Sequence, residues 1–333
     1  MTRPSLPAAR GLLSEFVIRR LQAPDAPLAV PAVWWSGDPL IDDDFALALY
    51  VAYELHYRGF AHVDDELEWD PGLLAFRGAL ERAFLDRLFD ECGSPPGTGS
   101  VEADLPDLLA HAGGPALSAY MEEHGTLDEM REFAVHRSAY QLKEADPHTW
   151  TIPRLEGATK AALIRIQADE YGFGTTHRMH QQLFVETMRE LGLDPTYGAY
   201  LDALPGSTLA TVNLITLFGL HRRWRGALVG NLAVYELTSV VPMGRYSSAL
   251  ARFGVGAAAR EFYDVHVVAD AEHQIIALHD LAGGLARDEP ELYADIMFGA
   301  RATLDVEARF AQNMLDAWSS GDSSLRHRIA SAA

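Results

Sequence analysis

The chain has 333 residues, of which 48% are hydrophobic and 22% charged, which is ordinary for a globular protein of one large or two small domains. Its formal net charge of −20 argues against nucleic acid and against an anionic membrane as partners. The single cysteine, Cys92, excludes an internal disulfide and a cysteine-ligated cluster, and we expect a cytoplasmic protein. The N-terminal residues lack the apolar core of a signal peptide, and no stretch reaches the ~20 apolar residues of a membrane span.

The first 100 residues are predicted to hold two helices. Several prolines interrupt residues 1–37, so we expect this stretch to be loosely ordered. Asp42–Asp44 can cap a helix that runs through FALALYVAYELHYRGF, and apolar residues at helical spacing predict a second helix from Pro71 to about Cys92. The stretch GSPPGTGS, residues 93–100, then predicts a linker.

The rest of the chain is predicted to be helical, because its Thr and Val residues lie inside helical patterns rather than in alternating runs. The expected helices cover about 104–112, 116–124, 127–145, 156–170, 176–192, 194–203, 208–240, 245–253, 257–283 and 289–318. We therefore expect an all-α protein with an N-terminal helical extension over 1–100, a larger helical domain over 101–320 and a flexible tail over 321–333.

The most informative motif is a stripe formed by His266, Asp270 and His273. Their spacing places all three side chains on one face of a helix. Two imidazoles and a carboxylate match the ligands of iron, manganese or zinc. The flanking positions are apolar, which indicates that the stripe points inward, where polar groups need partners. A solvated helix face that carries two histidines is the alternative that these three residues alone leave open.

Partners for such a stripe are expected on other helices, as in the di-metal sites of helical bundles. Three glutamates qualify. Glu144 is expected on a helix that Pro147 ends, Glu170 precedes two histidines, and Glu236 stands near the end of a long apolar helix. A lone glutamate in that last position needs a partner or a raised pKa.

Two histidines, His177 and His180, follow Glu170 in DEYGFGTTHRMH. On one continuous helix Glu170 and His177 would share a face more simply, because ten residues are not a whole number of turns. Gly172 and Gly174 allow the backbone to leave the helix between them. Helical phase alone therefore leaves both histidines open.

Taken together, these positions resemble the haem-oxygenase-like diiron oxidase and oxygenase family, also described as iron-containing redox enzymes. That family carries a Glu on one core helix, a Glu-x9-His pair on the next, a Glu on a third and His-x3-Asp-x2-His on a fourth. The sequences EADPHTW, DEYGFG and GALVGNLAVYE are also similar to the family, and the resemblance covers roughly residues 110–320. It selects His180 over His177. The ligand set that it implies is Glu144, Glu170, His180, Glu236, His266, Asp270 and His273.

The resemblance implies a haem-oxygenase-like helical bundle with two iron ions and O2 as co-substrate. Glu170 is expected to bridge the metals. One metal would be held by Glu144, His180 and one residue of the last helix, and the other by Glu236, His266 and Asp270, with His273 completing the set.

The resemblance further implies an oxidoreductase of specialised metabolism that acts on a small molecule. N-oxygenation of an amine or an amino-acid-derived substrate is favoured over oxidative desaturation or C–C cleavage of an amino or fatty acid. A haem-binding or non-catalytic helical protein is the more distant alternative. An external electron donor and a homodimer both stay open. Residues next to the ligands in sequence are the candidates for substrate contact, namely Trp150, Phe173, His177, Arg245 and Tyr246.

Two further features of the sequence are considered as candidates for metal binding. His148, four residues after Glu144, is a spare ligand candidate. The N-terminal part holds an acidic cluster formed by Asp42–Asp44, Glu54, His56, Asp64, Asp65, Glu66 and Glu68. Glu54 and His56 would face different ways on a helix, so we interpret this cluster as solvated surface or a helix cap.

Overall fold

The computed structural model describes residues 3–26, 36–93 and 97–329. Within these ranges the chain forms helices joined by turns and contains no β-strand. The prediction of an all-α protein is confirmed. None of the described helices is long and apolar enough to cross a membrane.

The N-terminal part contains three helices, α1 (Leu12–Gln22), α2 (Asp43–Glu54) and α3 (Pro71–Cys92). The predicted cap of α2 is confirmed, since the Asp42 carboxylate accepts a hydrogen bond of 2.8 Å from the backbone N–H of Phe45. The loose order predicted for residues 1–37 is wrong for α1. This helix lies between prolines and buries one apolar face against α2. Residues 27–35 of that stretch lie outside the described residues.

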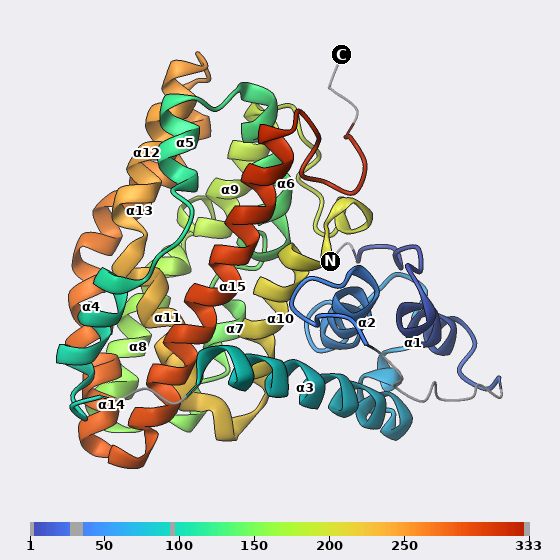
Figure 1. Ribbon diagram of the computed structural model, residues 1–333, viewed down its shortest axis with the longest axis horizontal. Helices are drawn as coiled ribbons and strands as arrows, with labels where there is room; N and C mark the ends of the chain where they lie inside the picture. Colours follow the sequence, from blue (N-terminus) through green and yellow to red (C-terminus); the bar gives the residue numbers. More distant parts are fainter. Residues whose placement is uncertain (1–2, 27–35, 94–96, 330–333) are drawn as a thin grey trace.

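The remaining helices form the larger part of the molecule. They are α4 (Val101–His111), α5 (Leu117–Glu123), α6 (Leu127–Gln141), α7 (Asp146–Thr149), α8 (Gly157–Glu170), α9 (His180–Glu190), α10 (Gly206–Leu220), α11 (Arg225–Thr238), α12 (Val240–Arg252), α13 (Ala257–Ile275), α14 (Gly283–Asp288) and α15 (Tyr293–Ser319). A π-helical segment, Ile276–Ala282, joins α13 to α14. Figure 1 shows these helices gathered in one bundle, with α1, α2 and α3 along one side of it.

Several predicted helices differ from the observed ones. The helix expected through residues 45–60 ends at Glu54. The helix expected over 208–240 is split into α10 and α11, because the chain turns at Arg222–Trp224 and buries the Trp224 ring against Phe218 and Phe298. The helix expected over 127–145 ends at Gln141. The one expected over 194–203 is a single 3-10 turn at its end.

Helices α11 and α15 pack closely against each other. A Cβ atom at Gly230 would lie 2.0 Å from the backbone oxygen of Ile296, and one at Gly299 would lie 2.0 Å from the backbone oxygen of Ala227. Only glycine fits at either position, so the two backbones touch. This contact fixes α11, the helix that carries Glu236, against the long C-terminal helix.

The N-terminal helices share their core with the bundle. Helix α2 packs on α10, α3 packs on α15, and one continuous apolar cluster includes residues from all of them. After α15, Ser323 and Ser324 lie against α6, where Glu132 accepts hydrogen bonds from the backbone N–H and the hydroxyl of Ser324 at 2.9 and 2.6 Å. The boundaries at 100 and 320 stay predictions. Residues 94–96 of the expected linker and 330–333 of the expected tail lie outside the described residues.

Candidate metal centre

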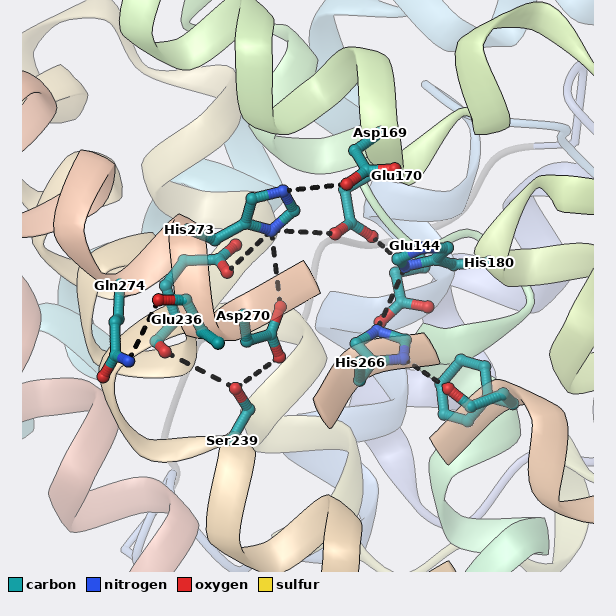
Figure 2. A network of polar contacts seen from close by, with 12 residues as sticks. Glu144, Asp169, Glu170, His180, Glu236, Ser239, His266, Asp270, His273 and Gln274 are labelled. Carbon is teal, nitrogen blue, oxygen red and sulfur yellow. Dashed lines mark hydrogen bonds and ion pairs between the residues drawn. The ribbon is translucent and has the colours of Figure 1, made fainter. Parts of the chain in front are cut away.

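The seven residues proposed as metal ligands meet in the centre of the bundle. Figure 2 shows their side chains converging from α8, α9, α11, α13 and the turn after α6. Each of the seven is at most 8% exposed to solvent. The inward orientation predicted for the stripe of His266, Asp270 and His273 is confirmed, and its reading as a solvated face is excluded.

A break in the helix brings Glu170 and His180 together. Helix α8 ends at Glu170, and Gly172 and Gly174 adopt φ values of +57° and +77°, a conformation that favours glycine. Helix α9 then begins at His180, whose Nδ1 lies 2.8 Å from Oε2 of Glu170. His177 lies in the intervening turn and is exposed. The break that the glycines permit is therefore present, and it places His180 in the cluster.

Glu144 stands in a turn and not, as expected, on a helix. Helix α6 ends three residues earlier, and Ala145 has a left-handed φ of +69°. The side-chain amide of Gln167, on α8, donates a hydrogen bond of 2.9 Å to the backbone oxygen of Ala145. Pro147 does not end the earlier helix but lies in the first turn of α7. The turn directs the Glu144 carboxylate toward α13.

Six of the seven side chains form two overlapping groups in which the possible ligand atoms lie within 4.8 Å of one another, and the seventh, Asp270, lies beside His273. One group comprises Glu144, Glu170, His180 and His266, and the other comprises Glu170, Glu236 and His273. Glu170 belongs to both groups, as expected of a bridging carboxylate.

The side chains group differently from the expected division of the ligands. His266 was expected beside Glu236, but its Nε2 lies 3.1 Å from Nδ1 of His180 and 3.6 Å from Oε1 of Glu144. His273 takes the place beside Glu236. Its Nδ1 lies 3.3 Å from Oε2 of Glu236 and 3.3 Å from Oδ1 of Asp270. The reason is the helical repeat, which places His266 and His273 two turns apart along α13.

A buried carboxylate oxygen of the cluster, Oε2 of Glu144, has no hydrogen-bond partner. Unpaired polar atoms in a protein interior cost free energy, and native proteins satisfy nearly all of them. A mixed set of imidazole nitrogens and carboxylate oxygens suits iron or manganese. The residues present therefore fit a pair of such ions.

The electrostatics of the cluster agree with this fit. Burial raises the pKa of Glu170 to about 7 and that of Glu236 to about 8. Burial alone would lower the pKa of the histidines, but the Glu144 carboxylate raises that of His266 to about 10, and Asp270 raises that of His273 to about 11. Burial and the crowding of carboxylates thus raise the pKa values of two glutamates and two histidines of the cluster. Two divalent ions would offset the charge of the carboxylates.

Neighbouring groups orient the ligands. The Nδ1–H of His266 donates to the backbone oxygen of Phe262 at 2.7 Å, which leaves Nε2 facing the cluster. The Nε2 of His273 lies 3.2 Å from Oδ2 of Asp169, and the Ser239 hydroxyl donates to Oδ2 of Asp270 at 2.5 Å. Such partners fix the ring orientation of metal-binding histidines. Sequence reasoning missed Asp169 and Ser239; the only signal was that each lies within three residues of a ligand.

A cavity of about 410 Å³ adjoins the cluster. Five cluster residues form one side of it, namely Glu144, Glu170, Glu236, His266 and Asp270. The other sides include Phe133, Arg137, Tyr246, Tyr263, Glu307 and residues 112–118, which lead into α5. The volume lies in the usual range for small-molecule sites.

The candidate substrate residues do not all line the cavity. Tyr246 lines the cavity, whereas Trp150, Phe173, His177 and Arg245 do not. The Trp150 ring packs against Tyr57 with 4.8 Å between the centroids, Phe173 is 63% exposed, and Arg245 lies 3.6 Å from Glu122. Arg137 and Glu307, which form an ion pair of 2.8 Å at the cavity wall, were missed because no local pattern shows that α6 and α15 meet there.

The remaining candidates are not part of the cluster. His148 lines the cavity, but its Nε2 pairs with Oδ1 of Asn231 at 2.8 Å. Among the N-terminal acidic residues, Asp42 and Asp64 cap helices. The interpretation as solvated surface is wrong for Glu54, which is 1% exposed and pairs with Lys143. Apart from the two groups of the cluster, no group of metal-ligand geometry occurs among residues 3–26, 36–93 and 97–329.

The fold and the cluster define an all-helical protein with a buried carboxylate–histidine centre. A family model described as iron-containing redox enzyme matches residues 131–308, more than half of the 333 residues, and the chain belongs to this family. The resemblance inferred from the sequence and the haem-oxygenase-like fold are thereby confirmed. The matched segment contains all seven cluster residues, and residues 1–130 precede it. None of the curated proteins matches the chain.

Proposed function

We propose that this iron-containing redox enzyme is a non-haem diiron oxidase or oxygenase that uses O2 on a small organic substrate. One observation carries the proposal: four buried carboxylates and three buried imidazoles converge, six of them in two groups that share Glu170 and the seventh, Asp270, beside His273. Glu144, His180 and His266 would hold one iron, and Glu236, Asp270 and His273 the other. When bound, two ferrous ions supply electrons and open coordination positions for O2 activation.

The residues around the cluster would prepare this site. Asp169 and Phe262 hold the rings of His273 and His266 in the orientation that presents the facing nitrogen to the cluster. The cavity would place a small molecule directly beside Glu144, Glu236 and Asp270. Its aromatic walls, which include Tyr246 and Tyr263, would exclude bulk water from that space.

A haem-binding function is less well supported. A haem site requires an axial ligand that faces the porphyrin. Here the imidazoles of His180, His266 and His273 all lie within 4 Å of carboxylates, and the cavity wall beside them is acidic. Such a wall suits cations better than a porphyrin with its own propionates.

Within this function, N-oxygenation of an amine or amino-acid-derived substrate is the reaction we favour, with oxidative desaturation and C–C cleavage as the alternatives. The preference comes from the family resemblance. The cavity volume of about 410 Å³ supports a small substrate. An external electron donor would be needed for each cycle that does not draw all its electrons from the substrate.

In the test, the protein is first loaded with ferrous iron under anaerobic conditions. Its oxygen uptake is then measured after O2 is supplied. We expect uptake to rise when a panel of primary amines, amino acids and fatty acids includes a substrate. The product should gain one oxygen atom from 18O2, as detected by mass spectrometry. His266→Ala should abolish the uptake, while His177→Ala, an exposed control, should leave it unchanged. A product that has lost two hydrogens would indicate oxidative desaturation instead of N-oxygenation, and one that has lost a carbon fragment would indicate C–C cleavage. If the iron-loaded protein takes up no oxygen, the proposed function is contradicted.

A further inference from the structure

The turn that carries Glu144 is held from outside the bundle. Residues 142–145 connect α6 to α7, and the end of α2 and the turn after it pack beside them through Glu54 and Arg58. Both of these residues precede the segment 131–308 that the family model matches. The contacts therefore join the N-terminal helices of this chain to the candidate metal centre.

A fully buried ion pair fixes the residue before Glu144. Nζ of Lys143 lies 3.2 Å from Oε2 of Glu54, and each of the two residues is 1% exposed. The Tyr197 hydroxyl donates to the same Glu54 oxygen at 2.7 Å, and Nζ lies 3.7 Å from the centre of the Tyr57 ring. Removing one partner of such a pair leaves the other charge buried and uncompensated, so the pair holds its two side chains in one arrangement.

Arg58 fixes the backbone on the same side. Its Nη2 donates to the backbone oxygen of Leu142 at 3.0 Å, and its guanidinium lies 4.0 Å from the centre of the Tyr197 ring. Because the guanidinium is both stacked and hydrogen-bonded, it has little freedom to leave Leu142. The N-terminal helices thus hold the turn at the two residues before Glu144.

Helix α8 holds the other end of the turn. Gln167 donates to the backbone oxygen of Ala145 at 2.9 Å, and the Tyr171 hydroxyl donates to Oδ1 of Asp146 at 2.7 Å. The left-handed φ of +69° at Ala145 is unfavourable for a residue with a side chain and persists only where its surroundings impose it. Each neighbour of Glu144 in the turn is thus held, whereas its own Oε2 has no hydrogen-bond partner.

We propose that Glu54 and Arg58 are positioning residues for Glu144. They hold the turn from the side of the N-terminal helices, so that the Glu144 carboxylate reaches His266 and His180. The inference rests on the proposed function, because it takes Glu144 as a ligand of the first metal. It gives the N-terminal helices a role in metal binding, although they supply no ligand themselves.

The experiment measures Mn2+ binding to the full chain by titration, together with the electron paramagnetic resonance spectrum. The variants are Glu54→Gln and Arg58→Gln. Glu81→Gln is the matched control, since Glu81 is also a buried N-terminal glutamate, 6% exposed and 3.1 Å from Arg77, but does not contact the turn. Thermal unfolding of each variant reports whether it is folded.

We expect the unsubstituted protein and Glu81→Gln to bind two Mn2+ ions with a spin-coupled spectrum. Glu54→Gln and Arg58→Gln should bind one ion as before and the other roughly 10–100-fold more weakly, with an uncoupled spectrum. A purely structural role would lower the unfolding temperature and leave the coupling intact, which would overturn the inference. Arg58 is half-buried, so its variant decides the matter if Glu54→Gln does not fold. Failure of the unsubstituted protein to bind Mn2+ would instead remove the proposed function, and this inference with it.

Discussion

Oε2 of Glu170 lies 2.8 Å from Nδ1 of His180, although the two residues are ten positions apart and could not share a face of one helix. The contact depends on the left-handed backbone between α8 and α9. At Gly172 a Cβ atom would lie 2.5 Å from the backbone carbon of Arg178. The left-handed backbone at Gly172, Phe173 and Gly174 thus belongs to the turn that brings His180 to the cluster.

Gly172→Ala should weaken metal binding and lower stability. The left-handed conformation costs a residue with a side chain about 1–2 kcal/mol, and the overlap with Arg178 adds to this cost because the clashing atom is backbone. Gly174→Ala is the matched control, because Gly174 has a similar φ of +77° and a Cβ atom added there would meet nothing within 4 Å. Iron content and thermal unfolding should separate the two variants; equal iron content would show that the overlap is tolerated.

The sequence predicted those parts of the site that depend on local periodicity. His266, Asp270 and His273 share a face because they lie on one helix, and their burial follows from the apolar residues beside them. The position of Glu144 could not be predicted this way, because it depends on a left-handed Ala145 that Gln167 holds from another helix. Only the resemblance selected His180, since the direction of the chain after the break depends on tertiary packing.

The same limit applies to the surroundings of the cluster. Nothing local to Glu54 shows that it meets Lys143, 89 residues further along the chain. The cavity wall formed by Arg137 and Glu307 depends on a separation of 170 residues. Helix α1 is missed because the prolines of residues 1–37 obscure the proline-free, amphipathic stretch between them.

Asp169→Asn should weaken binding of the metal beside His273. The carboxylate of Asp169 lies 3.2 Å from Nε2 of His273 and orients the ring, and loss of such a partner typically reduces metal affinity about 10–100-fold. The effect should appear in a ferrous-iron titration, with little change in thermal stability. Glu272→Gln is the control, since Glu272 pairs with Arg165 on the surface. An unchanged affinity in Asp169→Asn would show that packing alone orients His273.

Ala308→Phe should separate metal binding from substrate binding. Ala308 lines the cavity from α15 and is not one of the seven cluster residues, so the larger ring would fill part of the 410 Å³ without replacing a ligand. We expect two irons per chain as before and loss of substrate-stimulated oxygen uptake. Ala251→Phe, at an exposed position on α12, should leave both unchanged. Full substrate stimulation in Ala308→Phe would place the substrate elsewhere.

Acid should destabilise the protein through His136. Burial lowers the pKa of His136 to about 3, and the ring lies 2.6 Å from Oγ1 of Thr208 and 3.0 Å from Oγ of Ser324. The unfolded chain takes up this proton near pH 6.5. The neutral His136 ring therefore makes its full contribution to the free energy of unfolding above that pH. This contribution is lost as the pH falls from about 6.5 toward 3, by up to ~1.4 kcal/mol per pH unit.

Urea unfolding of the metal-free protein between pH 5 and 7 measures this dependence. His136→Gln should be less stable at pH 7 and should show a smaller change of unfolding free energy over that range. His177→Gln, whose ring is exposed, should keep the slope of the unsubstituted protein. The expectation fails if His136→Gln keeps that slope as well.

Iron content per chain after anaerobic ferrous loading and removal of excess metal tests the central claim most directly. The unsubstituted protein should hold two irons. His180→Ala, which removes a buried nitrogen from the first group, should hold no more than one, and His177→Ala, three residues away and exposed, should hold two. One iron or none in the unsubstituted protein, or two in His180→Ala, would contradict the assignment of a dinuclear centre to these seven residues.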